Sequence, residues 1–585
     1  MKKTITLFTL CFFMVFFSCS LEEHPARITA EGLAQDKQGA EQLVTGIYNR
    51  FWSSYLMTKT YWEWVEYDHD LSIGWDWALN GAGMGNFANH WGYNNDSDPF
   101  RNFYIIISRC NSAKAALETS DLSDVNIAHR YGEVLFLRAW SYFHLVRMYG
   151  PVPIRLSVAS DNDSPRAPIA EVYEQIVSDL KDAINNMQYG GHAAVGGFGH
   201  ADRTAAELLL ARVYCTMASG KLAGDGTEMY VNILNQSGTE TQVDPIATAT
   251  LVWTRFTTQK VMGSRIEDGY ASFNATELYG LAASLCSDVI ARKGESFDLL
   301  PEWYQIWGDA NKRNKEFVWG IASSDDNQFL SEGAPYYTIP PTWGGGGVIL
   351  LSDGCYKMYN YNSANPVNDE RVVSGVFHYV KDATFDLGRQ WYRFPTGDMR
   401  YNTAPDGIRP ASSDADVKDM YEDGTYYRPS AFSTKWYGGS LTNPNVVYAR
   451  MNSKVNQDMI LIRYSEAYLL RAEARNELDD AGGALADLQV IRNRVHAAPV
   501  TTTDKVQLRS MIFQENGLEY ALEYKRRFDL LRWGMYMNVM NATVVQLTPH
   551  NNVISRVREE RSLLCPVPTS EITQNKLFGS NNPGW

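Results

Sequence analysis

Tryptophan residues are concentrated near the amino-terminal end of this 585-residue chain. Five of its 16 tryptophans fall within 30 residues, where an even distribution would place about one: Trp62, Trp64, Trp75, Trp77 and Trp91. The last three stand among glycine and asparagine residues, which is typical of surface loops. Because an exposed aromatic ring can stack on the flat C–H face of a sugar, these three are candidate ligand-binding residues. Trp62 and Trp64 precede acidic residues in a stretch that suggests extended chain, and core packing is their simpler interpretation.

A sugar also presents hydroxyl groups, so its site needs hydrogen-bonding side chains beside the ring. Asp76, Asn94, Asn95 and Arg101 could supply them. Trp91 with Asn94 is the strongest pair. The alternative is a buried Trp91 that supports the loop.

A second aromatic cluster lies near the middle of the chain. Tyr336, Tyr337 and Trp343 are flanked by three prolines and by the four glycines 344–347. This composition also indicates a surface loop, and the three rings are further candidate ligand contacts.

Catalytic motifs are missing from the sequence. It contains no GxSxG, HExxH or Walker A motif. One acidic cluster could suggest the paired carboxylates of a glycosidase: Glu515, Glu519, Glu523 and Asp529. Its helical spacing favours ion pairing, because Glu523 precedes Arg526 and Arg527 by three and four residues. The chain is therefore interpreted as a non-enzyme.

No cofactor is expected. The acidic stretches 96–98 and 161–163 offer oxygen ligands for structural calcium, but neither is an EF-hand loop. No CxxC pair exists, so zinc is not expected. Five cysteines beyond the amino-terminal segment are widely spaced and are interpreted as small core residues: Cys110, Cys215, Cys286, Cys355 and Cys565.

Helical periodicity falls into two blocks that must position these loops. The first block predicts helices over 38–52, 103–117, 126–149, 169–187 and 203–218. The second predicts helices over 276–292, 459–478, 481–496 and 505–533. The short link between 478 and 481 forces antiparallel neighbours, as in a tetratricopeptide-like hairpin. Residues 219–275 and 294–458 are rich in Gly, Asn, Tyr and Trp, which predicts a loop-rich layer with a few short strands.

Most of the aromatic residues are expected to pack in the protein core. Trp140, Tyr142, Phe143 and Tyr468 fall on helices, and Trp307 and Trp319 fall on apolar stretches. The net charge of −14 argues against a nucleic-acid partner, because phosphate binding depends on clustered Lys and Arg.

The amino terminus has the pattern of an export signal. Lys2 and Lys3 precede an apolar run over 5–17 that is short for a membrane span. The following Ser18-Cys19 resembles a bacterial lipobox, which predicts cleavage after residue 18 and lipidation of Cys19. The alternative is an ordinary export signal with an incidental cysteine. The predicted divisions are a signal peptide 1–18, a helical part 19–218 with an aromatic loop 61–100, an inserted layer 219–458 and a helical part 459–585.

Long segments of both helical blocks resemble one known family. Residues 135–153 read LFLRAWSYFHLVRMYGPVP, and 202–214 read DRTAAELLLARVY. Residues 463–474 read RYSEAYLLRAEA, 515–523 read ENGLEYALE, and the chain ends in NNPGW. In this order they resemble the SusD/RagB family of outer-membrane nutrient-binding lipoproteins of Bacteroidetes. The resemblance is weak over 219–458, and 219–274 looks longer than the family's usual connection.

The resemblance implies a mostly α-helical fold of about four tetratricopeptide-like hairpins with an irregular ligand-binding subdomain, so that 19–585 forms one unit. It also implies a lipid-anchored, surface-exposed protein of the outer membrane that captures an oligosaccharide for a SusC-like TonB-dependent transporter. Glu22 and Glu23, after the lipobox, resemble the surface-export signal of such lipoproteins. A peptide-binding member, a surface glycoside hydrolase and a purely structural lid are the alternatives. The sequence names neither the ligand nor the oligomeric state beyond the transporter complex.

Overall fold

The structure is a computed structural model. It describes residues 29–53, 56–57, 60–74, 99–158, 163–191, 197, 199–235, 250–262, 268–307, 312–323, 338, 349–359, 369–373, 375–380, 389–393, 399–403, 407–410, 432–435, 458–543, 545–547, 553–555 and 558–585. None of the described helices has the length and hydrophobicity that a membrane-spanning segment requires. The predicted signal peptide and Cys19 lie outside the described residues.

The protein is mostly α-helical, as the sequence predicts. The long helices are α3 (Lys37–Tyr48), α6 (Pro99–Leu117), α7 (Val125–Tyr149), α8 (Ile169–Asn186), α10 (Arg203–Gly224), α12 (Ala275–Ala291), α17 (Ser465–Glu477), α18 (Ala481–Arg494) and α19 (Lys505–Glu519). Shorter helices are α2 (Ala30–Leu33), α4 (Thr60–Glu66), α14 (Asp353–Met358), α15 (Glu370–Val373), α20 (Arg526–Arg532), α21 (Tyr536–Ala542) and α22 (Thr569–Gln574). Single 3₁₀ turns are η1 (Asn49–Trp52), η3 (Trp303–Ile306) and η6 (Glu560–Leu563).

The helices begin and end where local chemistry favours it. Side chains of Asp124, Asp202, Asn274 and Asp504 accept the first free backbone N–H groups of α7, α10, α12 and α19. Helix α7 ends at Gly150, whose φ of 70° suits glycine.

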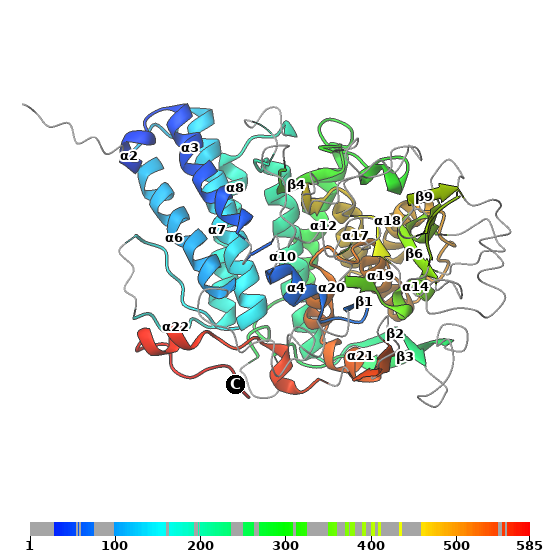
Figure 1. The fold of residues 1–585 in the computed structure, drawn as a ribbon. Coiled ribbons are helices and arrows are strands. Elements are labelled where there is room, and N and C mark those ends of the chain that lie inside the picture. The colour runs from blue at the N-terminus through cyan, green and yellow to red at the C-terminus, as the bar shows by residue number, and fades with distance from the viewer. Residues whose placement is uncertain are drawn as a thin grey trace, which may run out of the picture.

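Neighbouring helices pack as antiparallel hairpins in one continuous array. Contacts run from α6 through α7, α8, α10 and α12 to α17, which contacts both α18 and α19 (Figure 1). Ion pairs tie adjacent helices. The buried Arg138 of α7 bonds Asp179 of α8 at 2.8 and 2.7 Å, and the partly buried Arg471 of α17 bonds Asp487 of α18 at the same distances. The tetratricopeptide-like construction expected from the sequence is thus confirmed.

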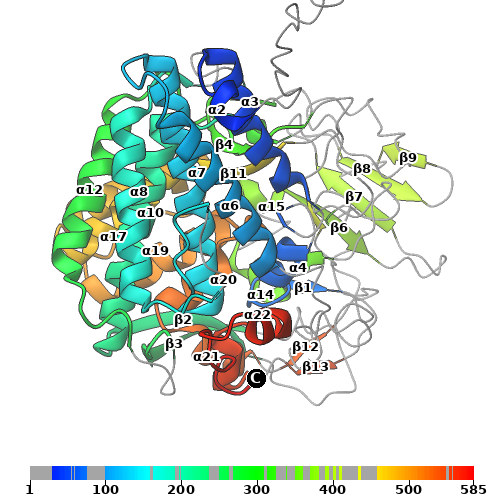
Figure 2. The same ribbon diagram turned by 90° about the vertical axis from the view of Figure 1, so that its left-hand side faces the viewer.

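Short antiparallel sheets accompany the helices, and the largest lies on the side of the molecule away from α8 and α12 (Figure 2). The largest has the order β10 (Phe432–Ser433), β6 (Val376–Val380), β7 (Arg389–Arg393), β8 (Met399–Thr403) and β9 (Gly407–Pro410). Four two-stranded sheets pair β1 (Ser72–Gly74) with β5 (Ile349–Leu351), β2 (Glu228–Asn235) with β3 (Thr250–Thr257), β4 (Phe317–Ile321) with β11 (Met459–Arg463), and β12 (Val545–Leu547) with β13 (Val553–Ser555).

Two predicted helices are wrong at one end. The run Met459–Arg463 is strand β11, because its apolar residues complete a buried sheet with β4. The predicted helix over 505–533 is broken after Glu519, where Leu522 and Tyr524 adopt positive φ before α20 begins. Residues 219–275 also hold more regular structure than predicted, since α10 extends to Gly224 and the β2–β3 hairpin follows.

The packing roles predicted for most aromatic residues are confirmed. Trp140, Tyr142, Phe143, Trp307, Trp319 and Tyr468 are buried, as are the five cysteines. Trp62 and Trp64 are buried as well, but on helix α4 rather than on extended chain.

Candidate functional site

The candidate ligand-binding residues lie outside the described part of the chain. This holds for Trp75, Trp77, Trp91, Asn94, Tyr336, Tyr337 and Trp343, and also for the polar candidates Asp76 and Asn95. Their roles therefore stay predictions. The described residues that flank these segments locate the points from which the segments start.

The flanks of the two aromatic segments are paired in one small sheet. Strand β1 ends at Gly74, directly before Trp75, and β5 begins at Ile349, shortly after Trp343. The two strands are antiparallel, with Ser72 opposite Leu351 and Gly74 opposite Ile349. The chain therefore leaves β1 and enters β5 at the same end of this sheet.

The sheet is fixed firmly to the body of the protein. Ile73 and Leu350 are buried, and the Ser352 N–H donates to Leu71 O at 2.9 Å. The Ser352 hydroxyl donates to Asp70 O at 2.6 Å. A Cβ at Gly74 would lie 2.2 Å from a ring carbon of Tyr67, so only glycine lets the strand pass so close to that ring.

A buried ionic cluster supports the turn before β1. Asp70 receives two hydrogen bonds of 2.8 Å from Arg526. Asp68 bonds Arg527 at 2.9 Å and Arg558 at 3.0 Å. Burial alone would raise the pKa of Asp68, but Arg558 and Arg527 hold it below its usual value. Both carboxylates therefore stay ionised and keep the turn attached to the carboxy-terminal helices.

The acidic cluster considered for glycoside hydrolysis is part of the core. Glu515, Glu519, Glu523 and Asp529 are each at most 2% exposed. Glu523 pairs with Arg463 at 2.8 Å and Lys435 at 2.6 Å, so its predicted pairing with Arg526 and Arg527 is wrong. The chain turns at positions 520–525, and these arginines face Asp70 and Asp68 instead. These carboxylates are enclosed and cannot reach a substrate.

The pKa of Glu519 also argues against an acid catalyst. Burial would raise it, but Arg494, Arg463 and Arg371 lower it to about 2. A group that protonates a leaving sugar needs a raised pKa. The ionised Glu519 carboxylate instead compensates the positive charge of three arginine side chains.

This shift predicts a loss of stability in acid. With an unfolded pKa of 4.5 and a folded pKa of about 2, the contribution of Glu519 is fully present above pH 4.5 and disappears as the pH falls through 2. The linkage amounts to about 3 kcal/mol. We expect Glu519→Gln to lower the free energy of unfolding at pH 7 and to flatten its decline between pH 4.5 and 2.5, measured by urea unfolding. The control is Glu118→Gln, in the exposed pair with Lys114; equal acid slopes for both variants would contradict the assignment.

The described residues give no support for a calcium site. The described chain holds no group of three His, Cys, Asp or Glu side chains arranged for a metal ion. Asp163 accepts a 2.8 Å hydrogen bond from the Lys576 N–H, and residues 96–98 and 161–162 lie outside the described part.

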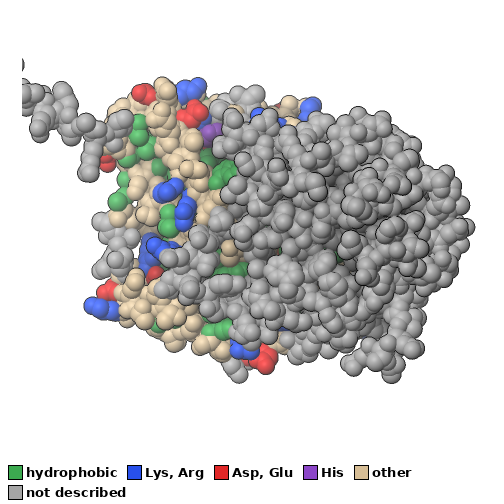
Figure 3. Space-filling view, viewed as in Figure 1, with side chains coloured by type: hydrophobic (Ala, Val, Ile, Leu, Met, Phe, Trp, Pro, Cys, Tyr) green, Lys and Arg blue, Asp and Glu red, His purple; other side chains and the backbone are tan. Residues whose placement is uncertain are grey.

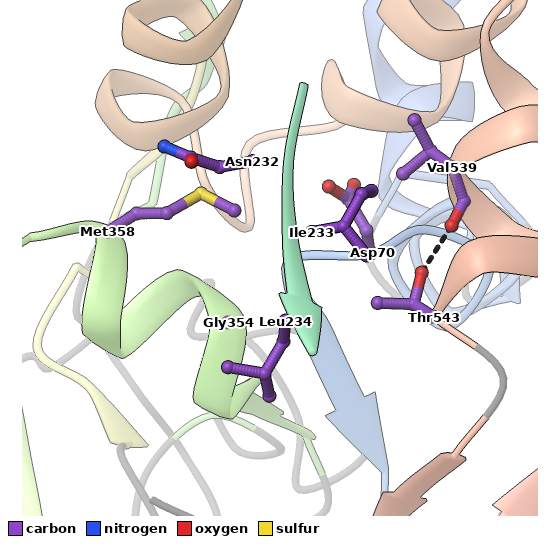
Figure 4. A pocket seen from close by; sticks show the side chains of 8 residues that line it. All are labelled: Asp70, Asn232, Ile233, Leu234, Gly354, Met358, Val539 and Thr543. Atoms are coloured by element: carbon purple, nitrogen blue, oxygen red, sulfur yellow. Dashed lines mark hydrogen bonds between the residues drawn. The ribbon is translucent and has the colours of Figure 1, made fainter. Parts of the chain in front are cut away.

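The cavity beside the residues that flank β1 and β5 is too small for a sugar. It is drawn in Figure 4 and has a volume of about 10 Å³, room for one water molecule. It is lined by Asp70, Asn232, Ile233, Leu234, Gly354, Met358, Val539 and Thr543. Its lining shows that β2 lies next to the residues that flank β1 and β5.

One exposed aromatic residue was missed in the sequence. Trp253 of β3 is 42% exposed and is the only described tryptophan classed as exposed. Alternation of apolar and polar residues along 228–235 could have identified its partner strand.

The described part of the face in Figure 3 carries side chains of both charge signs. Figure 3 shows basic, acidic and apolar side chains interspersed on the described part of one face. Such a surface is compatible with a neutral ligand.

Two family models match the chain. Residues 343–585 match the model of the SusD family, and residues 40–215 match a model described as "Starch-binding associating with outer membrane". Residues 216–342 lie between the two matched ranges.

Relatives extend over most of the chain. "SusD-like protein P2" of Formosa agariphila is 23% identical over 505 residues, covering 82% of this chain and 79% of the relative. "Starch-binding protein SusD" of Bacteroides thetaiotaomicron is 23% identical over 483 residues, covering 79% of this chain and 74% of the relative.

Solved structures share the fold. A SusD-like carbohydrate binding protein from Bacteroides fragilis aligns with a TM-score of 0.64 at 17% identity, covering 94% of this chain and 100% of that one. A SusD superfamily protein from Bacteroides vulgatus aligns with the same TM-score and coverages at 14% identity. Family models at both ends, relatives along most of the length and a common fold lead to one conclusion: the chain belongs to the SusD family.

Proposed function

We propose that this protein is a cell-surface glycan-binding lipoprotein that captures oligosaccharides and delivers them, without cleaving them, to a SusC-like TonB-dependent transporter. Lipidation at Cys19 would hold residues 19–585, acting as one unit, at the outer face of the outer membrane. The matching starch-binding family model, the starch-binding relative and the carbohydrate-binding structural neighbour support a carbohydrate ligand, and the family model supports an outer-membrane setting.

The pairing of β1 with β5 carries the proposal. Trp75 follows Gly74 in the chain, and Trp343 lies six residues before Ile349. Both aromatic segments therefore start from one sheet end, although they are more than 240 residues apart in sequence. We propose that Trp75, Trp77, Trp91 and Asn94 meet Tyr336, Tyr337 and Trp343 in a single binding platform.

The setting of this sheet suits a binding role. Aromatic rings hold a sugar well only when their supporting backbone is fixed, since ordering a loose loop costs free energy. Asp68 and Asp70 fasten the turn before β1 through Arg527 and Arg526, and Ser352 fastens β5 to the same turn. The base of the proposed platform is thus pre-organised.

The proposal predicts saturable glycan binding without turnover. We expect the mature chain to bind at least one of soluble starch, xyloglucan, mixed-linkage β-glucan or arabinan in affinity gels, and to bind its hexasaccharide in calorimetry. Chromatography of the incubated sugar should show no shorter product. Binding to peptides alone would favour the peptide-binding alternative, and product release would restore the hydrolase.

A further inference from the structure

The β2–β3 hairpin presents an exposed tryptophan on a regular strand. Strand β3 pairs with β2 from Glu228 opposite Thr257 to Asn235 opposite Thr250. Its Trp253 is 42% exposed, whereas most described tryptophans are buried. The hairpin falls in the range between the two family-matched parts of the chain.

Polar side chains flank this tryptophan on the same face of the sheet. Residues two apart along a strand share a face, so Trp253 and Arg255 lie on the face of their cross-strand partners Asn232 and Tyr230. The Asn232 amide donates to Gln514 Oε1 of α19 at 2.6 Å. This bond leaves the Asn232 carbonyl oxygen and the Gln514 N–H groups with hydrogen-bonding capacity.

The second row of the face is held in place and is electrically neutral. Arg255 pairs with Glu228, and its guanidinium carbon lies 6.0 Å from the centre of the Tyr230 ring. The Tyr230 N–H donates to the Ser510 hydroxyl of α19 at 2.8 Å, which fixes the edge of β2. A paired Arg–Glu offers hydrogen bonds without a net charge, which suits a neutral hydroxylated ligand rather than an anion.

The hairpin also adjoins the base of the proposed binding platform. Ile233 and Leu234 of β2 line the cavity in Figure 4 together with Asp70, which precedes β1, and Gly354, which follows β5. The hairpin is therefore a neighbour of the elements from which the proposed platform starts.

We infer that the face formed by Trp253, Arg255, Tyr230, Asn232 and Gln514 is a second carbohydrate-binding subsite for a neutral polysaccharide. Trp253 stacks on a sugar ring, and the two amides and the Arg255–Glu228 pair bind its hydroxyl groups. The inference rests on the proposed function, and it adds that long chains engage the protein at two places. The gain over a short chain comes from effective concentration, because both surfaces belong to one molecule.

The test compares Trp253→Ala with Val252→Ala in the mature chain. Val252 is equally exposed, at 42%, but its side chain lies on the opposite face of the same strand. We expect Trp253→Ala to weaken retention by the polysaccharide gels about five- to tenfold, the loss typical of one stacking contact. Its affinity for the hexasaccharide and its melting temperature should match those of the unmodified protein, and Val252→Ala should change nothing.

The outcomes separate this inference from the proposed function. If the unmodified protein binds no glycan of the panel, both fail. If it binds and Trp253→Ala is retained like Val252→Ala, only the second subsite is overturned. If Trp253→Ala loses hexasaccharide affinity and polysaccharide retention equally, the hairpin belongs to one common site and the inference of a separate subsite is wrong.

Discussion

Replacing Arg463 by methionine should cost about 3–5 kcal/mol of unfolding free energy, the usual effect of removing one partner from a buried ion pair. Arg463 is completely buried and bonds Glu316 at 2.9 Å, Glu519 at 2.8 Å and Glu523 at 2.8 Å. Methionine fills a similar volume but leaves these carboxylates with less positive charge around them. Urea unfolding followed by circular dichroism measures the loss.

A matched control is Lys505→Met on the surface. Lys505 pairs with Asp479 at 2.7 Å, but their side chains are 38% and 80% exposed, so we expect a cost below about 1 kcal/mol. The prediction for Arg463 would be refuted if both variants unfolded at the same urea concentration.

The size of this effect reflects the position of Arg463 in the fold. It ends β11, Glu316 precedes β4, and Glu519 ends α19. Arg494 of α18 completes the group by bonding Glu316 and Glu519 at 2.6 Å each. The cluster thus joins the middle part of the chain to the carboxy-terminal helices, and its loss should loosen both.

Helices could be predicted from the sequence because their signals are local. The boundaries of α7 and α8 and the start of α10 follow from apolar spacing, from capping residues such as Asp202 and from Gly150 at the end of α7. Burial of Trp140 followed from the same periodicity.

Features that depend on distant partners escaped prediction. Met459–Arg463 becomes a strand only because Phe317–Ile321 lies beside it. Glu523 has arginines three and four residues ahead, but the turn after Glu519 redirects it to Arg463 and Lys435. Pairing of Gly74 with Ile349 likewise joins segments 275 residues apart, which no local pattern reveals.

Removing one aromatic residue from each segment should nearly abolish binding. We expect Trp91→Ala and Trp343→Ala each to weaken hexasaccharide binding about tenfold, and the double variant about a hundredfold or more. The reason is that β1 and β5 start both segments from one sheet end, so both rings should contact the same ligand. Calorimetry of these variants in a Trp253→Ala background measures the dissociation constant for the hexasaccharide without a contribution from the β2–β3 hairpin.

Stoichiometry distinguishes one shared site from two separate ones. With a shared site, one hexasaccharide binds in every variant and only the dissociation constant rises. With separate sites, the protein that carries only Trp253→Ala binds two hexasaccharides. Trp91→Ala or Trp343→Ala then removes one of these binding events and leaves the affinity of the remaining site unchanged. Leu281→Ala on the exposed face of α12 is the control and should have no effect, since Leu281 is 41% exposed and α12 belongs to the helical array. A fall in stoichiometry at constant affinity would therefore contradict the shared platform, whereas a rising dissociation constant at constant stoichiometry would support it.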